Sequence, residues 1–157
     1  MSDQARPLVA ADVEPRSKPS NYPEPFASRV AGRIKRSLGD AFGLKNFGVN
    51  LTTLKPGAIS ALHHRHSVQD EFIYVVSGMA TVTIGDKEHQ AGPGMVVGFP
   101  AGGDAHHVRN DTEEDLTILE IGDRLPGDSG SYPNDDIAAR LNSDGKWEFT
   151  RKDGTPY

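Results

Sequence analysis

The feature that most constrains the fold is a series of short runs between residues 47 and 121 in which apolar and polar side chains alternate. In residues 47–53 the alternation is clean, and a Pro-Gly pair follows. Residues 80–84 alternate in the same way before Gly85-Asp86, which suits a two-residue hairpin turn. Further β-rich runs, separated by turn signals, cover residues 71–76, 95–99, 106–109 and 116–121. Many short strands at nearly even spacing predict an all-β sandwich or small barrel.

Segments of a different character flank these strands. Residues 1–27 hold five of the eleven prolines without apolar periodicity, which predicts an extended proline-rich arm. Residues 28–125 are expected to form the barrel. Residues 126–157 are expected to pack on it as a C-terminal extension, with a short helix at 137–141 and a strand at 146–150. The predicted fold is therefore a small antiparallel β-barrel or jelly roll with N- and C-terminal extensions.

Composition narrows the class of protein. A chain of 157 residues fits a single domain, and a net charge of −5 argues against a nucleic-acid partner. No apolar run approaches the ~20 residues of a membrane span, and the first residues do not form a secretory signal. The absence of cysteine excludes disulfides, thiol nucleophiles and cysteine-ligated metals. We therefore expect a soluble, cytoplasmic protein without a nucleic-acid or membrane partner.

Histidines carry the chemical signal, because five of the six fall into two clusters. The clusters are His63, His64 and His66, and then His106 and His107. Residues two apart in a strand face the same side, so His64 and His66 can aim at one point. Glu71 opens an apolar strand, where a charge is costly unless it is paired or bound to a metal. These groups and a third imidazole, from His106 or His107, predict a mixed nitrogen–oxygen site for one divalent first-row metal, with open positions for water or substrate.

The first histidine cluster belongs to a spaced motif. Six residues separate Gly57 from His64, and His66 completes a His-x-His pair. Four residues then precede Glu71, and six more lead to Gly78.

The second cluster belongs to another such motif. Five residues follow Gly94 and lead to Pro100, which begins a Pro-x-Gly triplet that ends at Gly102. Three residues separate Gly102 from His106, and Asn110 stands four positions beyond His106.

With these two motifs in this order, the sequence resembles the cupin superfamily. The resemblance implies a jelly-roll barrel holding one divalent transition metal on His64, His66, Glu71 and His106, and it leaves open zinc, manganese, iron or nickel. The gap before His64 and the gap before His106 are each one residue longer than in the family pattern, which a one-residue bulge absorbs. The alternative register uses His63 and His107 as ligands.

Other segments sharpen the resemblance. Residues 21–26, 122–127 and 152–157 are similar to those of a bacterial group of single-domain cupins, some of which are provisionally described as sugar phosphate isomerases. The resemblance implies an enzyme in which the metal acts as a Lewis acid on a small oxygen-rich, sugar-phosphate-like metabolite. The alternatives are an iron-dependent dioxygenase and a non-catalytic module that binds or senses a small ligand. No catalytic base is identified.

Two further patterns concern partners. Phe72, Tyr74 and Val76 share the strand face opposite Glu71 and are all apolar, so a homodimer is expected to cover them. The alternative is that the proline-rich arm folds back over this face in its own chain. A small anionic ligand that chelates the metal is expected inside the barrel. The basic cluster Arg29, Arg33, Lys35 and Arg36 is interpreted as a solvated strand face, with contact to an anionic substrate or across a dimer as the alternative.

Overall fold

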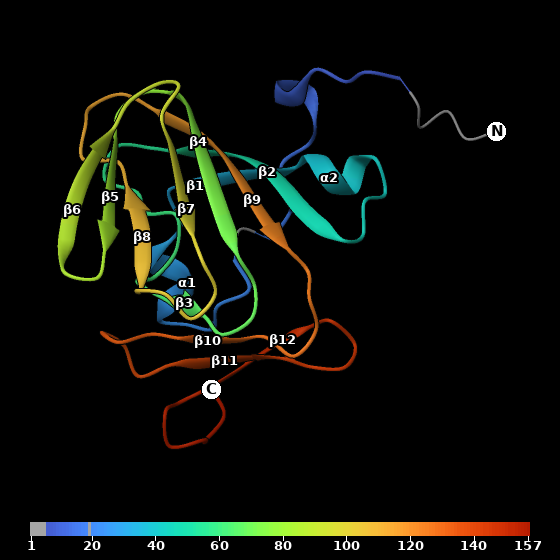
Figure 1. The fold of residues 1–157 in the computed structure, drawn as a ribbon, viewed down its shortest axis with the longest axis vertical. Helices are drawn as coiled ribbons and strands as arrows, with labels where there is room; N and C mark the ends of the chain where they lie inside the picture. The colour runs from blue at the N-terminus through green and yellow to red at the C-terminus, as the bar shows by residue number, and fades with distance from the viewer. Residues whose placement is uncertain (1–5, 19) are drawn as a thin grey trace.

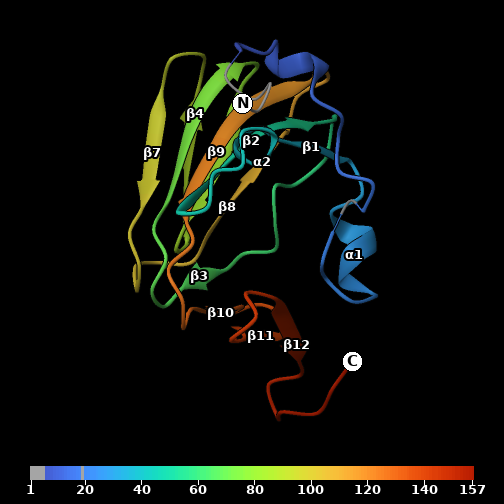
Figure 2. The same cartoon turned by 90° about the vertical axis from the view of Figure 1, so that its right-hand side faces the viewer.

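The computed structural model describes residues 6–18 and 20–157, so residues 1–5 and 19 of the expected arm lie outside it. Antiparallel strands form two facing sheets, and a third sheet lies across one end of them (Figures 1 and 2). The described helices are short: η2 (Ala10–Asp12), α1 (Phe26–Arg29) and α2 (Leu38–Ala41). The all-β jelly-roll prediction is confirmed, although the strands of the described residues form separate sheets and not one closed barrel.

The largest sheet has five strands in the order β1-β2-β9-β4-β7. In that order the strands are β1 (Arg33–Ser37), β2 (Phe47–Leu54), β9 (Leu116–Asp123), β4 (Glu71–Ser77) and β7 (Val96–Phe99). Residues paired directly across two strands face the same side of a sheet. The register pairs Glu71 with Gly122, Ile73 with Glu120, and Val75 with Ile118. The inner face of the sheet is therefore apolar at one end of β4 and charged at the other.

The facing sheet has three strands in the order β6-β5-β8. These strands are β5 (Ala80–Ile84), β6 (Lys87–Ala91) and β8 (His106–Arg109). Val82 and Val108 pair across β5 and β8 and pack against the apolar end of the large sheet. This packing forms a core that includes the buried side chains of Leu54, Val75 and Ile118.

The third sheet is made by the C-terminal segment and lies below the other two in Figure 1. Its strands are β3 (Arg65–His66), β10 (Ser129–Ser131), β11 (Ala138–Leu141) and β12 (Trp147–Thr150), in the order β12-β11-β10-β3. The helix expected at 137–141 is wrong, because the backbone of β11 pairs with both β10 and β12. The strand expected at 146–150 is present as β12. Pairing of β10 with β3 brings the C-terminal sheet next to the histidine motif.

A second apolar cluster joins the N-terminal segment to the C-terminal sheet. Phe26 of α1 packs with Leu62, Tyr132 and Ile137, which are buried. Tyr22 lies edge-on to the ring of Tyr132, with the ring centroids 5.9 Å apart. The described part of the arm also follows β1, where the backbone N–H of Arg16 donates to the carbonyl of Lys35 over 2.9 Å.

Gly78 of the first motif has a structural role at the turn after β4. Its φ is +83°, a conformation that glycine adopts without steric cost. A Cβ atom there would lie 2.7 Å from the carbonyl oxygen of Asp115 and 2.9 Å from the Cα of Leu116.

No helix among the described residues is long and apolar enough to cross a membrane.

Candidate metal centre

Three neighbouring segments bring the candidate ligands to the charged end of the inner face. His64 forms an isolated antiparallel bridge with His106, the first residue of β8. His66 lies in the two-residue strand β3, and Glu71 is the first residue of β4. The side chains of His64 and His66, two residues apart in extended backbone, therefore both point toward the Glu71 carboxylate, as the His-x-His spacing predicts.

Glu71 lies at the centre of the imidazole cluster. Its Oε2 is 2.7 Å from Nε2 of His106, 3.4 Å from Nε2 of His64 and 3.6 Å from Nε2 of His66. Donor atoms of His64, His66 and Glu71 all lie within 4.8 Å of one another, a group able to hold a metal ion. The structure thus brings together all four predicted residues, three of them in that compact group.

Hydrogen bonds on the far side of two rings determine which nitrogen faces the carboxylate. The Nδ1–H of His64 donates to the carbonyl of Leu62 over 2.7 Å, and the Nδ1–H of His66 donates to Oδ2 of Asp128 over 2.5 Å. A neutral imidazole bonded through Nδ1–H presents an unprotonated Nε2 on its other side. Both rings therefore present Nε2 to the space beside Glu71, and in their neutral form they offer lone pairs there, which is the arrangement that a metal ligand needs.

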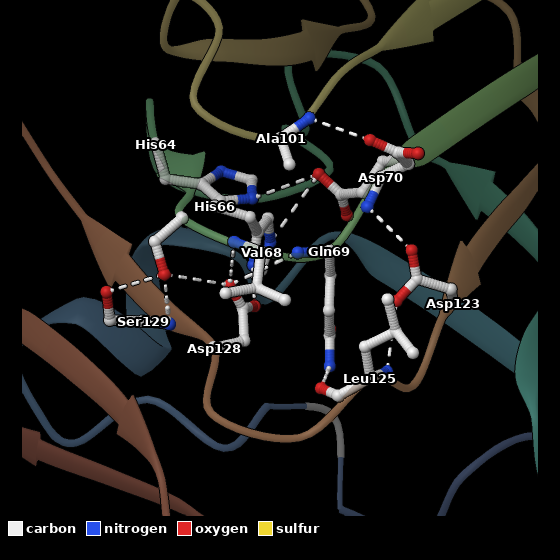
Figure 3. Close-up of polar contacts among 12 residues, drawn as sticks. His64, His66, Val68, Gln69, Asp70, Ala101, Asp123, Leu125, Asp128 and Ser129 are labelled. Carbon is white, nitrogen blue, oxygen red and sulfur yellow. Dashed lines mark hydrogen bonds and ion pairs between the residues drawn. The ribbon is translucent and has the colours of Figure 1, made fainter.

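Asp128 is the residue that holds the His66 ring (Figure 3). It is fully buried, and its Oδ1 accepts the backbone N–H groups of Val68 at 2.9 Å and Gln69 at 3.3 Å. A buried carboxylate is tolerated when its oxygens are hydrogen-bonded in this way. The loop between His66 and Glu71 is thereby tied to the C-terminal segment.

The ring of His106 is held mainly by packing. It stacks on Phe99 with the ring centroids 3.8 Å apart and an interplanar angle of 3°. Its Nδ1 is 3.4 Å from the carbonyl oxygen of Asp104. This face-to-face contact directs Nε2 of His106 toward Glu71.

The cluster shifts the pKa values of its members. Burial by itself would raise the pKa of Glu71, but hydrogen bonds from His106 and His64 and the charge of His64 hold it well below its usual value. Burial would lower the pKa of His64, yet the hydrogen bond and the charge of Glu71 leave it raised. Glu71 is therefore an anion at neutral pH, as a metal ligand must be.

The alternative histidines lie elsewhere. The rings of His63 and His107 contact each other edge-on, with the centroids 5.2 Å apart. The imidazoles paired with Glu71 are instead those of His64, His66 and His106. Burial, followed by the charge of His63, lowers the pKa of His107 to about 4. His89 is exposed in β6. The geometry thus favours the register in which His64, His66 and His106 surround Glu71.

The cluster opens into a cavity of about 280 Å³ between the large sheet and the C-terminal sheet. His64, His66, Glu71 and His106 line one part of it, and aromatic side chains from the arm and C-terminal sheet line another. These aromatic residues are Tyr22, Tyr132, Trp147 and Phe149. Trp147 lies beside His66, with the ring centroids 5.8 Å apart.

The basic cluster does not lie on one solvated strand face, which corrects that interpretation. Arg33 and Lys35 are on the inner face of β1 and line the cavity. Lys35 forms an ion pair with Glu120, with Nζ 2.8 Å from Oε2. Arg29 pairs instead with Asp135 at 2.5 Å, and Arg36 donates to the carbonyl of Val13. The residues of β1 do alternate between two faces, but the face that carries Arg33 and Lys35 is directed into the cavity and not into solvent.

Sequence reasoning missed two carboxylates of this region, Asp128 and Glu120. Asp128 stands in a Gly-Asp-Ser loop that reads as an ordinary turn. Glu120 interrupts the apolar strand 116–121, and its position in that run was the available signal. The second-motif residue Asn110 proves structural, since its Nδ2 donates to the carbonyls of Leu54 and Glu114.

Comparison with known proteins places this architecture in a family. Residues 50–122 match the family model described as the cupin domain. A crystal structure from Silicibacter pomeroyi, described as a sugar phosphate isomerase from a cupin superfamily, is 38% identical with a TM-score of 0.89. The match covers 97% of this chain and 96% of that one. This chain is a cupin.

Two other relatives extend the comparison. A cupin-fold structure from Acidithiobacillus ferrooxidans, provisionally described as a sugar phosphate isomerase, is 37% identical over 80% of each chain, with a TM-score of 0.72. Auxin-binding protein 1 of Arabidopsis thaliana is 32% identical over 117 residues. That match covers 68% of this cupin but only 54% of the plant protein. This cupin therefore corresponds to about half of its plant relative and to nearly all of the S. pomeroyi protein.

Proposed function

We propose that this cupin is a metal-dependent isomerase of a small phosphorylated, sugar-like metabolite. The observation that carries the proposal is that the His64, His66 and Glu71 group opens into the same small cavity as the cations of β1. The descriptions of the two bacterial structures, at 37% and 38% identity, support the same substrate class. A cavity of about 280 Å³ suits a ligand smaller than the drug-sized molecules that fill larger pockets.

We propose His64, His66, Glu71 and His106 as the ligands of one divalent transition metal. The donor set supports this, because neutral imidazoles and a carboxylate suit first-row divalent ions and leave the choice among zinc, manganese, iron and nickel to availability. When bound, such an ion supplies Lewis-acid polarisation of a carbonyl or hydroxyl group. Three neutral imidazoles and one carboxylate leave a divalent ion with a net positive charge, which favours an anionic ligand.

Isomerisation also needs a group that takes a proton from the carbon beside a carbonyl and returns it to the neighbouring carbon. We propose Glu120 for this role. It is a carboxylate in the cavity wall outside the imidazole cluster, and it accepts a hydrogen bond from the Thr52 hydroxyl over 2.5 Å. Burial would raise the pKa of Glu120, but the charge and hydrogen bond of Lys35 keep it below its usual value. The carboxylate is therefore ionised and able to accept a proton.

The test is an assay of aldose and ketose phosphates with protein loaded separately with zinc, manganese, iron or nickel. We expect interconversion that depends on the metal, leaves oxygen unconsumed and is lost in Glu120→Gln. Oxygen consumption by the iron form would indicate the dioxygenase instead. Binding without turnover of any sugar phosphate, with or without oxygen, would indicate a ligand-binding or sensing module.

We also propose a homodimer formed through the outer face of the large sheet. Phe72, Tyr74 and Val76 on this face are 39–42% exposed, and Val96 of the edge strand β7 is exposed beside them. The described part of the arm follows β1, at the opposite edge of the sheet. A contiguous apolar face of this kind favours self-association.

We propose the cytoplasm as the compartment, which suits a chain free of cysteine.

A further inference from the structure

The cavity has a cationic side formed by β1. Register pairs Arg33 with Leu54 and Lys35 with Thr52, and Leu54 and Thr52 are fully buried on the inner face of β2. Arg33 and Lys35 therefore point inward. Arg33 donates a hydrogen bond to the carbonyl of Ser60, which fixes one end of its guanidinium in the cavity wall.

The arm adds a third cation to the same side. The backbone hydrogen bond from Arg16 to Lys35 holds the arm against β1. The side chain of Arg16 donates from Nε to the Ser37 hydroxyl over 2.8 Å and from a terminal nitrogen to Asn50 Oδ1 over 3.4 Å. Ser37 and Asn50 are a register pair on the inner face. Arg16 thus lies over the β1 side of the cavity.

The cations of the cavity are concentrated on one side of it. Four cationic side chains line it, against three carboxylates, in a chain whose net charge is −5. The cations are Arg16, Arg33, Lys35 and Arg124, and the carboxylates are those of Glu71, Glu120 and Asp123. Arg124 is paired with Asp40 at 2.6 Å. Of the carboxylates, Glu71 belongs to the imidazole cluster and Asp123 accepts the backbone N–H of Asp70, so the three cations of β1 and the arm lie beside Glu120, which is paired with Lys35.

Gathering these cations has an electrostatic cost. Burial first, and then the charge of Arg33, lowers the pKa of Arg16. Burial also lowers the pKa of Lys35, where Glu120 opposes the shift and Arg33 adds to it. Like charges held together in a partly buried wall repel one another, and a bound anion relieves that repulsion.

We propose that Arg16, Arg33 and Lys35 form a subsite for the phosphate monoester group of the ligand. Guanidinium groups pair with phosphate oxygens through two parallel hydrogen bonds, and a dianion offsets more of the local charge than a carboxylate does. The strand of Glu71 is three strands from that of Lys35, roughly 14 Å at the backbone. The side chains reach inward from both positions, so a short chain with a phosphate at one end and a hydroxy-carbonyl pair at the other spans the cavity.

The test is calorimetric titration of the full-length protein, as purified, with glycerol 3-phosphate, glycerate and glycerol. We expect glycerol 3-phosphate to bind more tightly than the other two compounds and to weaken as salt is added. Arg33→Gln and Arg16→Gln should each lower its affinity roughly tenfold or more, the loss typical of one charge-assisted hydrogen bond. The control is Lys55→Gln, which removes a surface cation paired with Asp115 and should leave binding unchanged.

Arg16→Gln keeps the test decisive if the Arg33 variant fails to fold, because Arg16 lies on the exposed arm. Three results would overturn the subsite: equal binding of glycerol and glycerol 3-phosphate, preference for glycerate, or phosphate binding that survives in the arginine variants but is lost in His64→Ala.

The phosphate subsite rests on the isomerase function only for the position of the hydroxy-carbonyl end of the ligand, so experiments can contradict the subsite and the isomerase function separately. Arginine-dependent binding of glycerol 3-phosphate without turnover of any sugar phosphate would support the subsite and contradict the isomerase. Turnover of sugar phosphates with an unchanged KM in Arg16→Gln and Arg33→Gln would do the reverse.

Discussion

Asp128 and His66 are joined by a hydrogen bond of 2.5 Å although 62 positions separate them in the chain. The carboxylate is completely buried, so the C-terminal segment places a charge inside the protein, against the His66 ring and the loop that follows it. The contact decides the tautomer of His66 and thereby which nitrogen faces Glu71. A segment beyond the cupin-domain match at residues 50–122 thus completes the candidate metal centre.

Replacing Asp128 with asparagine tests this dependence. Asp128→Asn can present an amide to Nδ1 of His66, which no longer favours the tautomer with Nε2 free. We expect metal affinity to fall by about 10–100-fold, the usual effect of losing such a partner. Competition with a chelator measures the affinity, and Asp144→Asn, in the exposed β11–β12 turn, is the matched control. Unchanged affinity in Asp128→Asn would show that the His66 ring is oriented by other contacts.

The ligand assignment predicts loss of metal from single alanine variants. His64→Ala and His106→Ala should each abolish stoichiometric metal, because each removes a donor beside Glu71. Elemental analysis of purified protein measures the metal, and circular dichroism checks that the β fold remains. His89→Ala changes an exposed histidine of β6 and should retain full occupancy. Full metal content in His106→Ala would restrict the ligand set to the three-residue group.

The partly buried ion pair of Lys35 and Glu120 predicts a pH dependence of stability. The folded protein holds the pKa of Glu120 below its ordinary value of 4.5, so the unfolded chain takes up the proton first. The pair therefore stabilises the fold above pH 4.5, and this contribution is lost as pH falls through the folded pKa. Glu120→Gln should lower the free energy of unfolding by about 3 kcal/mol at pH 7, since it leaves the partly buried Lys35 without this carboxylate.

Denaturant unfolding at pH 7 and in steps below pH 4.5 measures this effect. The difference between wild type and Glu120→Gln should shrink as the pH falls. The double variant Lys35→Met, Glu120→Gln should recover part of the loss, because no charge is then left unpaired. A difference that stays constant with pH would contradict the assigned role of the carboxylate.

The homodimer predicts that a charge on the outer sheet face separates the subunits. Phe72→Glu and Tyr74→Glu place carboxylates on the apolar face and should give the monomer mass of 16.9 kDa in light scattering at micromolar concentration. Leu125→Glu changes an apolar residue that is 53% exposed in a loop, and it should keep the mass of the wild type. A wild-type mass of 16.9 kDa under the same conditions would refute the dimer.

Gly78 and Gly94 have the same φ of +83°, so substituting each by alanine compares the cost of backbone strain alone with the cost of strain plus a steric clash. Gly94→Ala meets no atom within 4 Å and should cost about 1 kcal/mol of folding free energy from its left-handed backbone alone. Gly78→Ala adds a close contact with Asp115 and Leu116, and should cost a further 1–3 kcal/mol. Denaturant unfolding compares the two variants, and equal losses would show that the turn after β4 relaxes freely.

The strands and three of the candidate ligands, His64, His66 and Glu71, were predictable because their signals are local, whereas the choice of His106 depended on the resemblance to the cupins. Alternation along β2 and β5, and turn residues such as Gly85, follow from the two-residue period of a strand and from allowed backbone angles. The spacing of His64 and His66 follows from the same period. Glu71 was identified because a charge at the start of an apolar strand needs a partner.

Which surroundings each strand face contacts, solvent, cavity or another segment, was decided only by the tertiary structure. The basic residues of β1 have the same alternation whether they face water or a cavity, and the register with β2 and the approach of the arm turn Arg33 and Lys35 inward. The segment at 137–141 favours a helix locally but forms β11, because pairing with β10 and β12 satisfies its backbone. Asp128 reaches His66 only when the C-terminal sheet pairs with β3, a contact between distant segments that no local pattern encodes.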